Sequence, residues 1–215
     1  MLANRVRSGD RQVCARVSHV IYKLFRIYTK EQFKVEVTLE QADVEVEFEL
    51  PVTPELAWDY LTNPVIKRQY READSLTVLG GSRTGAGTVH HCVHGLQVND
   101  ELIVDWQPFR QITYEDQISY PILAFDMLNT TLLEPTAAGT LVKMRFQKPV
   151  SVDPRLNWLV KFLWWIYGKG HIARLFGRRA PVTLRRLITE GHNSGSINDT
   201  DQSPLIQATG RLHRG

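Results

Sequence analysis

The sequence predicts an α+β domain in which an antiparallel sheet of about seven strands is followed by a long C-terminal helix. Three observations predict this class. Apolar and acidic residues alternate strictly over residues 43–50, which is the period-two pattern of a strand with one buried face. Further strand-like segments then follow one another without a long helical pattern between them. Beyond Asp153, apolar residues recur at helical spacing.

The first strand runs directly into a short helix. Thr53 is the expected N-cap, because its hydroxyl can accept a backbone N–H, and Pro54 fits the first helical turn. Asn63 should end the helix, since a residue that precedes proline avoids the α region. Residues 44–64 therefore predict a strand-to-helix junction at the start of the domain. The strand side chains expected to face the core are those of Val44, Val46, Phe48 and Leu50.

The other strand candidates are separated by turn residues rather than by helices. Glycine and proline supply the breaks, at Gly80-Gly81, Gly85, Pro108 and Gly139. Their uninterrupted succession predicts an antiparallel meander. The candidates are residues 75–79, 87–94, 98–106, 111–119, 125–134 and 140–147.

Residues 153–190 carry the strongest helical pattern of the chain. Asp153 can cap this helix, and Pro154 suits its first turn. We expect two helical pieces rather than one, because Gly168 and Gly170 weaken the pattern and Pro181 should kink or interrupt it.

The chain divides by composition into three parts. At 215 residues it is long enough for one domain with a substantial core, which we place at residues 41–190. Residues 1–40 add a basic amphipathic helix, over residues 13–28, and an extended lead-in. Residues 191–215 are small and polar, and predict a disordered tail.

Charge is distributed unevenly along the chain. Residues 1–30 hold seven basic residues (Lys and Arg) and one acidic residue. Residues 31–135 hold six basic and eighteen acidic residues, and residues 136–190 hold eleven basic and two acidic residues. Either the basic ends neutralise the acidic middle within the fold, or one basic surface faces anionic lipid or another polyanion.

Cysteine content and hydropathy bound the compartment. Cys14 and Cys92 are far apart in segments of different kinds, so no disulfide framework is indicated. No run approaches the roughly 20 apolar residues that a membrane span needs, and no secretory h-region is visible. We expect a cytoplasmic protein, with peripheral membrane contact as an open alternative.

Two segments resemble a known superfamily. ELPVTPELAWDYLTNP (residues 49–64) resembles the strand-to-helix junction of the polyketide cyclase/dehydrase and lipid-transport superfamily, abbreviated SRPBCC. TVHHCVHG, followed by ELIVDWQPF, is similar to a bacterial branch of it. The resemblance covers about residues 40–190 and implies the START-like or helix-grip fold, in which a curved sheet wraps the last helix around a cavity. Members include lipid carriers, cyclases and coenzyme Q binders, so the resemblance leaves activity open.

The resemblance and the apolar patterning together favour binding or transport of a hydrophobic small molecule, such as a lipid, an isoprenoid or a polyketide-like compound. No cofactor is implied. Nucleic acid is not an expected partner, because base-stacking motifs on strands are missing from the sequence. The residues expected to line the cavity are Trp58, His94, Trp106, Tyr114, Phe125, Met127, Asn129, Thr131, Phe146 and Phe162.

His90, His91, Cys92 and His94 are the densest cluster of chemically capable side chains. On a strand, His90, Cys92 and His94 share one face and could contribute to a transition-metal site. Alternate residues lie roughly 7 Å apart along a strand, however, so three of them do not easily share one ion. Polar cavity lining is the favoured interpretation.

The enzyme alternative is a cyclase or dehydratase that uses His91 or His94 as general acid or base. Asp105 or Glu115 could orient the imidazole from a neighbouring strand, although both have the spacing of solvated carboxylates. Cys92 is a weaker nucleophile candidate, since no activating partner is identifiable.

Residues 157–179 combine aromatic and basic side chains in the manner of helices that lie on a membrane surface. Ordinary burial of one helix face against the sheet is the alternative. Two adjacent tryptophans cannot both face one narrow core seam, which favours a surface role for part of the segment. A module that docks on a membrane or on a partner through its basic helices is therefore a further functional alternative. The candidate membrane-surface residues are Lys161, Trp164, Trp165, Lys169, Arg174, Arg178 and Arg179.

Overall fold

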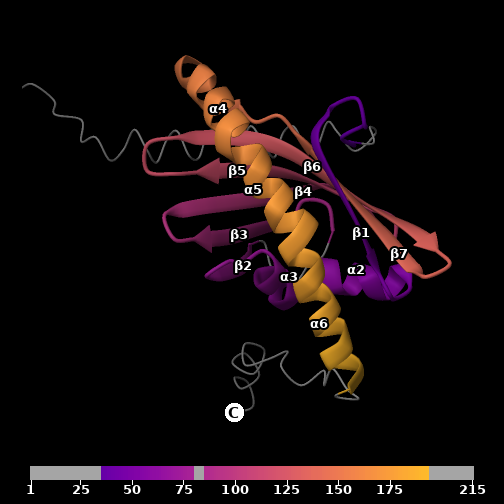
Figure 1. The fold of residues 1–215 in the computed structure, drawn as a ribbon. Coiled ribbons are helices and arrows are strands. Elements are labelled where there is room, and N and C mark those ends of the chain that lie inside the picture. The colour runs from indigo at the N-terminus through magenta and orange to yellow at the C-terminus, as the bar shows by residue number, and fades with distance from the viewer. Residues whose placement is uncertain (1–34, 80–84, 194–215) are drawn as a thin grey trace, which may run out of the picture.

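One curved antiparallel sheet and a long helix that crosses it form the fold of this computed structural model, which describes residues 35–79 and 85–193 (Figure 1). The sheet order is β1-β7-β6-β5-β4-β3-β2, and β8 pairs with β6. Every pairing is antiparallel, so the predicted meander is confirmed. The strands are β1 Ala42–Leu50, β2 Ser75–Leu79, β3 Val89–His94, β4 Gln97–Gln107, β5 Gln111–Ser119, β6 Ala124–Thr136, β7 Gly139–Gln147 and β8 Val150–Ser151.

Two short helices connect β1 to β2. These are α2, Pro54–Thr62, and α3, Pro64–Tyr70. Thr53 occupies the N-cap position of α2, but its side chain makes no capping bond to the helix, contrary to expectation. Asn63 does more than end α2, because its Oδ1 accepts hydrogen bonds from the Val65 and Ile66 amides and so caps α3.

The C-terminal helix is continuous. It begins with a 3₁₀ turn at Pro154–Leu156, which Asp153 caps through the Arg155 amide, and runs to Asn193. The expected break at Pro181 is wrong. Pro181 lies in the first turn of its α-helical piece, directly after a π turn, where a missing N–H and a bulky ring are tolerated. The pieces are α4 Asn157–Leu163, π turn Trp164–Gly168, α5 Lys169–Arg174, π turn Leu175–Arg179 and α6 Ala180–Asn193.

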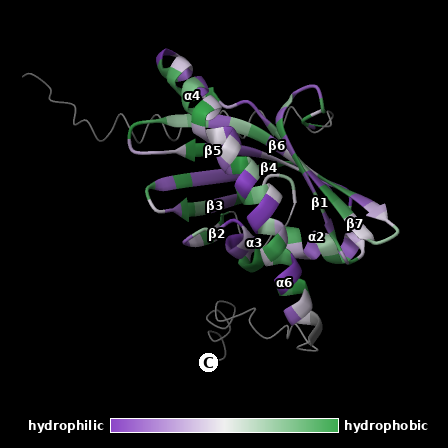
Figure 2. Cartoon of the chain, viewed as in Figure 1, coloured by the Kyte–Doolittle hydropathy of each residue, from purple (hydrophilic) through white to green (hydrophobic). Residues whose placement is uncertain are grey.

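The solid core fills one end of the space between sheet and helix. There β1 contributes Val46, Phe48 and Leu50, α2 contributes Trp58, and α6 contributes Leu184, all of them buried. Figure 2 shows hydrophobic and hydrophilic residues interleaved along the C-terminal helix, as expected when only one of its faces packs inward. The other end of the space is hollow.

Several expectations lie outside the described residues. These are the helix over residues 13–28, the turn at Gly80-Gly81 and most of the tail, residues 194–215. In the part of the chain that the structure describes, no helix combines the length and the apolar character needed to span a bilayer.

Candidate ligand-binding site

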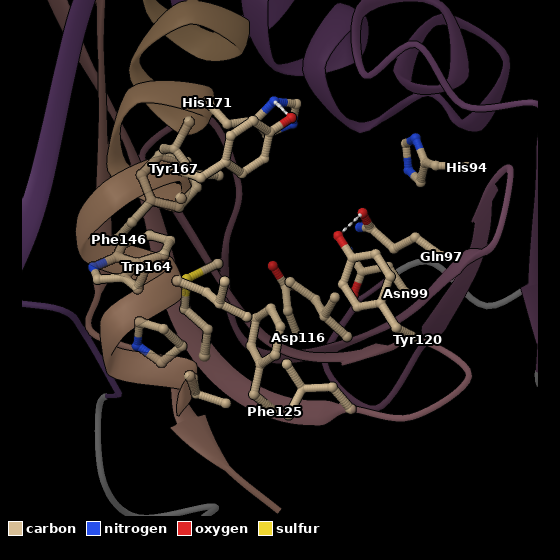
Figure 3. Close-up of a pocket in the computed structure, with 18 of the residues that line it drawn as sticks. His94, Gln97, Asn99, Asp116, Tyr120, Phe125, Phe146, Trp164, Tyr167 and His171 are labelled. Atoms are coloured by element: carbon tan, nitrogen blue, oxygen red, sulfur yellow. Dashed lines mark hydrogen bonds between the residues drawn. The ribbon is translucent and has the colours of Figure 1, made fainter. Parts of the chain in front are cut away.

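A cavity of about 970 Å³ lies between the sheet and the first half of the C-terminal helix (Figure 3). Its walls are mainly apolar. Ile118, Phe125, Met127 and Phe146 line it from the sheet, and the turn between β5 and β6 adds Tyr120, Ile122 and Leu123. The helix lines it with Leu159, Val160, Leu163, Trp164, Ile172 and Phe176.

Trp164 faces inward while its neighbour Trp165 faces outward. Trp164 is 5% exposed, whereas Trp165 is 71% exposed. The Trp164 indole Nε1 donates a hydrogen bond of 2.6 Å to Asp43 Oδ2 on β1, so the polar edge of the ring is satisfied within the wall. This bond joins the helix to the edge strand of the sheet and holds the Trp164 ring against the cavity.

The polar end of the cavity is formed by Arg71, His94, Asn99 and Asp116. Strand register explains why polar side chains meet there. His90, Glu101, Asp116 and Met127 are successive partners across β3, β4, β5 and β6, and directly opposed residues in a sheet share a face. One row across the sheet therefore carries two carboxylates and an imidazole on its buried side.

Glu101 is the centre of a buried charge cluster. Its side chain and that of Lys67 are wholly buried, and Lys67 Nζ lies 2.5 Å from Glu101 Oε2. Arg71 Nη1 and Asn99 Nδ2 both donate to Glu101 Oε1. Burial opposes ionisation of Glu101, but the positive charges of Arg71 and Lys67 outweigh it and lower the pKa of the carboxyl. Glu101 is therefore held as a carboxylate without contact with water.

His90 completes the contacts of Lys67. Its Nδ1 lies 2.9 Å from Lys67 Nζ, and the same ammonium lies 3.8 Å from the centre of the Tyr114 ring. Burial and the Lys67 charge lower the pKa of His90 to about 3, so the imidazole is neutral and accepts the hydrogen bond at Nδ1. His90 is a structural partner of Lys67.

Asp116 differs from Glu101 in that no cation among the described residues is bonded to it. Its Oδ2 accepts a hydrogen bond of 2.7 Å from Asn129 Nδ2, while its Oδ1 has no partner among the described residues. Burial and the neighbouring charge of Glu101 raise the pKa of Asp116 to about 7. The two carboxyl groups thus have opposite pKa shifts, and Asp116 exchanges its proton near neutrality at the cavity wall.

Four of the residues expected to line the cavity do so: His94, Phe125, Met127 and Phe146. Asn129 supports Asp116 from beside the wall. The other expected residues lie elsewhere. Trp58 and Trp106 pack edge to face at 4.7 Å in the solid core, and Thr131 belongs to that same end of the sheet, paired with Ile112. Tyr114 lies beneath Lys67, and Phe162 is half-exposed on the outer side of the helix.

The histidine cluster divides between the two faces of β3. His90 and Cys92 are buried and His94 lines the cavity, whereas His91 lies on the outer face, 2.7 Å from Asp100 Oδ1. Of the two candidate general bases, only His94 reaches the cavity. Among residues 35–79 and 85–193, no three His, Cys, Asp or Glu side chains are grouped to hold a metal ion. Burial raises the pKa of Cys92 to about 12, which leaves a protonated thiol.

The candidate membrane-surface residues also separate. Trp164 is buried, Lys169 pairs with Asp43 at 2.9 Å, and Arg179 pairs with Glu72 at 2.8 Å. Lys161, Trp165, Arg174 and Arg178 are exposed. Trp165 belongs to an outward apolar stripe along the helix, whose members are Trp158, Phe162, Trp165 and Ile166.

Sequence reasoning did not select Lys67, Arg71, Asn99, Glu101 or Asp116. One signal for Asp116 was present, since it alternates with Ile112, Tyr114 and Ile118 on the apolar side of its strand. No comparable signal marks Lys67, because α3 is too short for a helical period to show which side is buried.

Comparison with known proteins adds support for the fold. No protein-family model matches the chain, and no curated protein matches it. Among solved structures, the protein MLL2253 from Mesorhizobium loti superposes with a TM-score of 0.51 at 18% identity, over 68% of this chain and 96% of that one. A conserved protein from Geobacillus kaustophilus superposes with a TM-score of 0.53 at 14% identity, over 68% of this chain and 95% of that one. An uncharacterised protein from Rhizobium leguminosarum superposes with a TM-score of 0.51 at 17% identity, over 68% of this chain and 93% of that one.

At these identities the likeness concerns the fold alone. The fold is the α+β type predicted from the sequence, with an open antiparallel sheet and a long C-terminal helix. Any function must be argued from the site itself.

Proposed function

We propose that the protein binds or transports a hydrophobic small molecule in the cavity between the sheet and the C-terminal helix. The observation that carries this proposal is the cavity of about 970 Å³ with a largely apolar wall. Ligand pockets typically measure about 300–1,000 Å³ and combine an apolar lining with a few polar groups. The cavity is at the upper end of that range, and its wall includes polar side chains such as His94, Asn99 and Asp116.

The composition of the wall supports an extended apolar ligand. Side chains from the sheet, the β5–β6 turn and the helix contribute aliphatic and aromatic surface, including Ile118, Phe125, Met127 and Val160. Transfer of apolar ligand surface from water to such a wall is favourable by about 25 cal/mol per Å². A lipid, an isoprenoid or a polyketide-like compound, as the SRPBCC resemblance implies, offers that surface.

The test begins with protein purified without detergent. Native mass spectrometry should detect a non-covalent apolar adduct, and an anilinonaphthalene dye should bind to delipidated protein at one site per chain. The Ile118→Trp variant makes a larger side chain project into the cavity and should reduce dye affinity at least tenfold. Leu96→Trp, in the exposed turn before β4, is the control and should bind as the wild type does. Absence of both adduct and dye binding would overturn the proposal.

We propose a second function, contact with an anionic membrane, because of the outward apolar stripe. Trp158, Phe162, Trp165 and Ile166 lie at helical spacing and are all at least half-exposed. The exposed cations Lys161, Arg174 and Arg178 lie on the same helix. This pairing of aromatic and basic side chains suits the interface of an anionic bilayer.

A further inference from the structure

Three buried side chains have unsatisfied polar atoms at the same end of the cavity. The atoms are Arg71 Nε, Asn99 Oδ1 and Asp116 Oδ1, and none has a hydrogen-bond partner within the part of the chain that the structure describes. The three residues are only 8%, 5% and 2% exposed. Buried polar groups are almost always satisfied in folded proteins, so three such atoms around one cavity indicate a place for a polar group of a ligand.

The three atoms belong to one connected cluster. Arg71 and Asn99 both donate to the same oxygen of Glu101, and Asp116 lies directly opposite Glu101 on the neighbouring strand. Directly opposed residues of antiparallel strands are about 4.5–5.5 Å apart at Cα. A single small head group can therefore reach more than one of the three atoms.

The surrounding bonds fix which atoms are free. Asn99 uses its Nδ2 on Glu101, so the oxygen of its amide is the unsatisfied atom. Asp116 uses Oδ2 on the Asn129 amide, which leaves Oδ1. Arg71 uses Nη1 on Glu101, and its buried Nε hydrogen has no partner among the described residues. The site thus offers one donor from Arg71 and one acceptor from Asn99, while Asp116 Oδ1 accepts when ionised and can donate when protonated.

This set of atoms discriminates between head groups. A hydroxyl group both donates and accepts, and so satisfies the site in either protonation state of Asp116. An ether or ester oxygen cannot donate to Asn99 Oδ1. A carboxylate is disfavoured because its oxygens meet the Asn99 oxygen and the Glu101 charge. An ammonium group is disfavoured because the like charges of Arg71 and Lys67 repel it.

We propose that Arg71, Asn99 and Asp116 form a recognition site for a hydroxyl group on an otherwise apolar ligand, an alcohol or a phenol. The site lies at one end of the cavity, so it also orients the ligand, with the hydroxyl toward the sheet and the apolar body beneath the helix. This inference rests on the proposed function, because it assumes that the cavity holds a ligand.

The experiment measures displacement of the anilinonaphthalene dye by four probes of equal length. They are decan-1-ol, methyl nonyl ether, decanoate and decylammonium. Decan-1-ol should bind about tenfold more tightly than each of the others, which corresponds to one or two hydrogen bonds. Equal displacement by all four, or stronger displacement by decanoate or decylammonium, would overturn the hydroxyl site and leave the proposed function standing. If the dye itself does not bind, the proposed function fails first.

Two near-isosteric variants test whether Asp116 and Asn99 cause the preference for decan-1-ol. Asp116→Leu and Asn99→Leu should each reduce the affinity for decan-1-ol severalfold and leave that for methyl nonyl ether unchanged. Asp100→Leu, on the outer face of the same sheet, is the matched control and should keep the wild-type order. If the affinities for the alcohol and the ether fell equally, these residues would support the shape of the cavity without recognising the hydroxyl group. Should one variant not fold, the wild-type comparison of the four probes still decides.

Discussion

Asp116 and Glu101 show how strongly position alone can separate two carboxyl groups. Both are buried and lie opposite each other in the sheet, yet of the two carboxyl groups it is Glu101 that Arg71 and Lys67 contact. Glu101 is held ionised, and Asp116 then experiences both burial and the Glu101 charge. The cost of burying a charge is thus met by direct pairing at one residue and by a raised pKa at the other.

The raised pKa of Asp116 predicts a pH-dependent contribution to stability. In the unfolded chain an aspartate titrates near pH 4, whereas in the folded protein the pKa of Asp116 is about 7. Between these values the folded state binds the extra proton. The contribution of Asp116 is therefore fully present below about pH 4 and is lost as the pH rises through about 7.

Replacement by asparagine should remove that dependence. Relative to wild type, Asp116→Asn should gain about 2–3 kcal/mol in the free energy of unfolding between about pH 5 and about pH 8. Urea denaturation of both proteins across this range gives the difference, in which the titration of other groups cancels. A difference that stays constant with pH would show that Asp116 ionises normally in the folded protein.

At the residue scale, the sequence predicted apolar wall residues better than polar ones. Phe125, Met127 and Phe146 were expected in the cavity because they alternate on strands, and they line it. The buried cluster was not expected, because the position of Lys67 beside Glu101 depends on how α3 packs against the sheet. The spacing of apolar residues along the chain does not predict that packing.

Among the elements, the C-terminal helix depends most on single glycines. Gly168 lies in the first π turn, and a Cβ added there would collide with the indole of Trp164. Gly170, two residues later in α5, has open space around its Cα. The two positions therefore have opposite requirements within one helix.

These environments predict opposite effects of alanine. Gly168→Ala should lower the free energy of unfolding by about 1–3 kcal/mol, because the Trp164 ring must move from its place beside Asp43. Gly170→Ala should raise it by about 0.5–1 kcal/mol, because alanine is the better helix former. Chemical denaturation measures both, and dye affinity should fall only for Gly168→Ala. Changes of the same sign would contradict the predicted collision.

Strands were predicted more accurately than helix continuity. Each strand of the meander agrees with its predicted bounds to within two residues, because alternation and glycine breaks are local signals. The short β8, Val150–Ser151, was missed, since two residues carry no period. Helix continuity at Pro181 depended on the preceding π turn, which propensity does not reveal.

For the whole molecule, the outward apolar stripe predicts binding to anionic vesicles. The full chain should sediment with phosphatidylglycerol vesicles and less so at high salt, because exposed cations contribute through the surface potential. The double variant Phe162→Ala/Trp165→Ala should reduce the vesicle partition coefficient at least tenfold, since each large side chain contributes about 1.5–3 kcal/mol when buried.

An exposed residue away from the stripe provides the control. Leu96→Ala removes a side chain of comparable exposure in the turn before β4 and should leave sedimentation unchanged. Equal sedimentation of the double variant and wild type, or equal binding to neutral vesicles, would contradict membrane contact through this stripe.

At the scale of the whole chain, the sequence predicted the fold class and the side of the sheet on which to look for a ligand. Element order and alternation were sufficient for both. The volume of the cavity was not predictable, because it depends on how far the helix stands from the sheet. That separation follows from contacts such as Trp164 with Asp43, between residues far apart in sequence.

The place of β1 at one edge of the sheet has a consequence for self-association. Glu45, Glu47 and Glu49 lie along one face of this strand, and cations of β7 and a threonine of β6 contact them from inside the same molecule. If β1 of a second copy paired here in antiparallel register, the two rows of carboxylates would lie side by side. Their mutual repulsion discourages growth of the sheet from one molecule into the next, and so protects this edge against fibril formation.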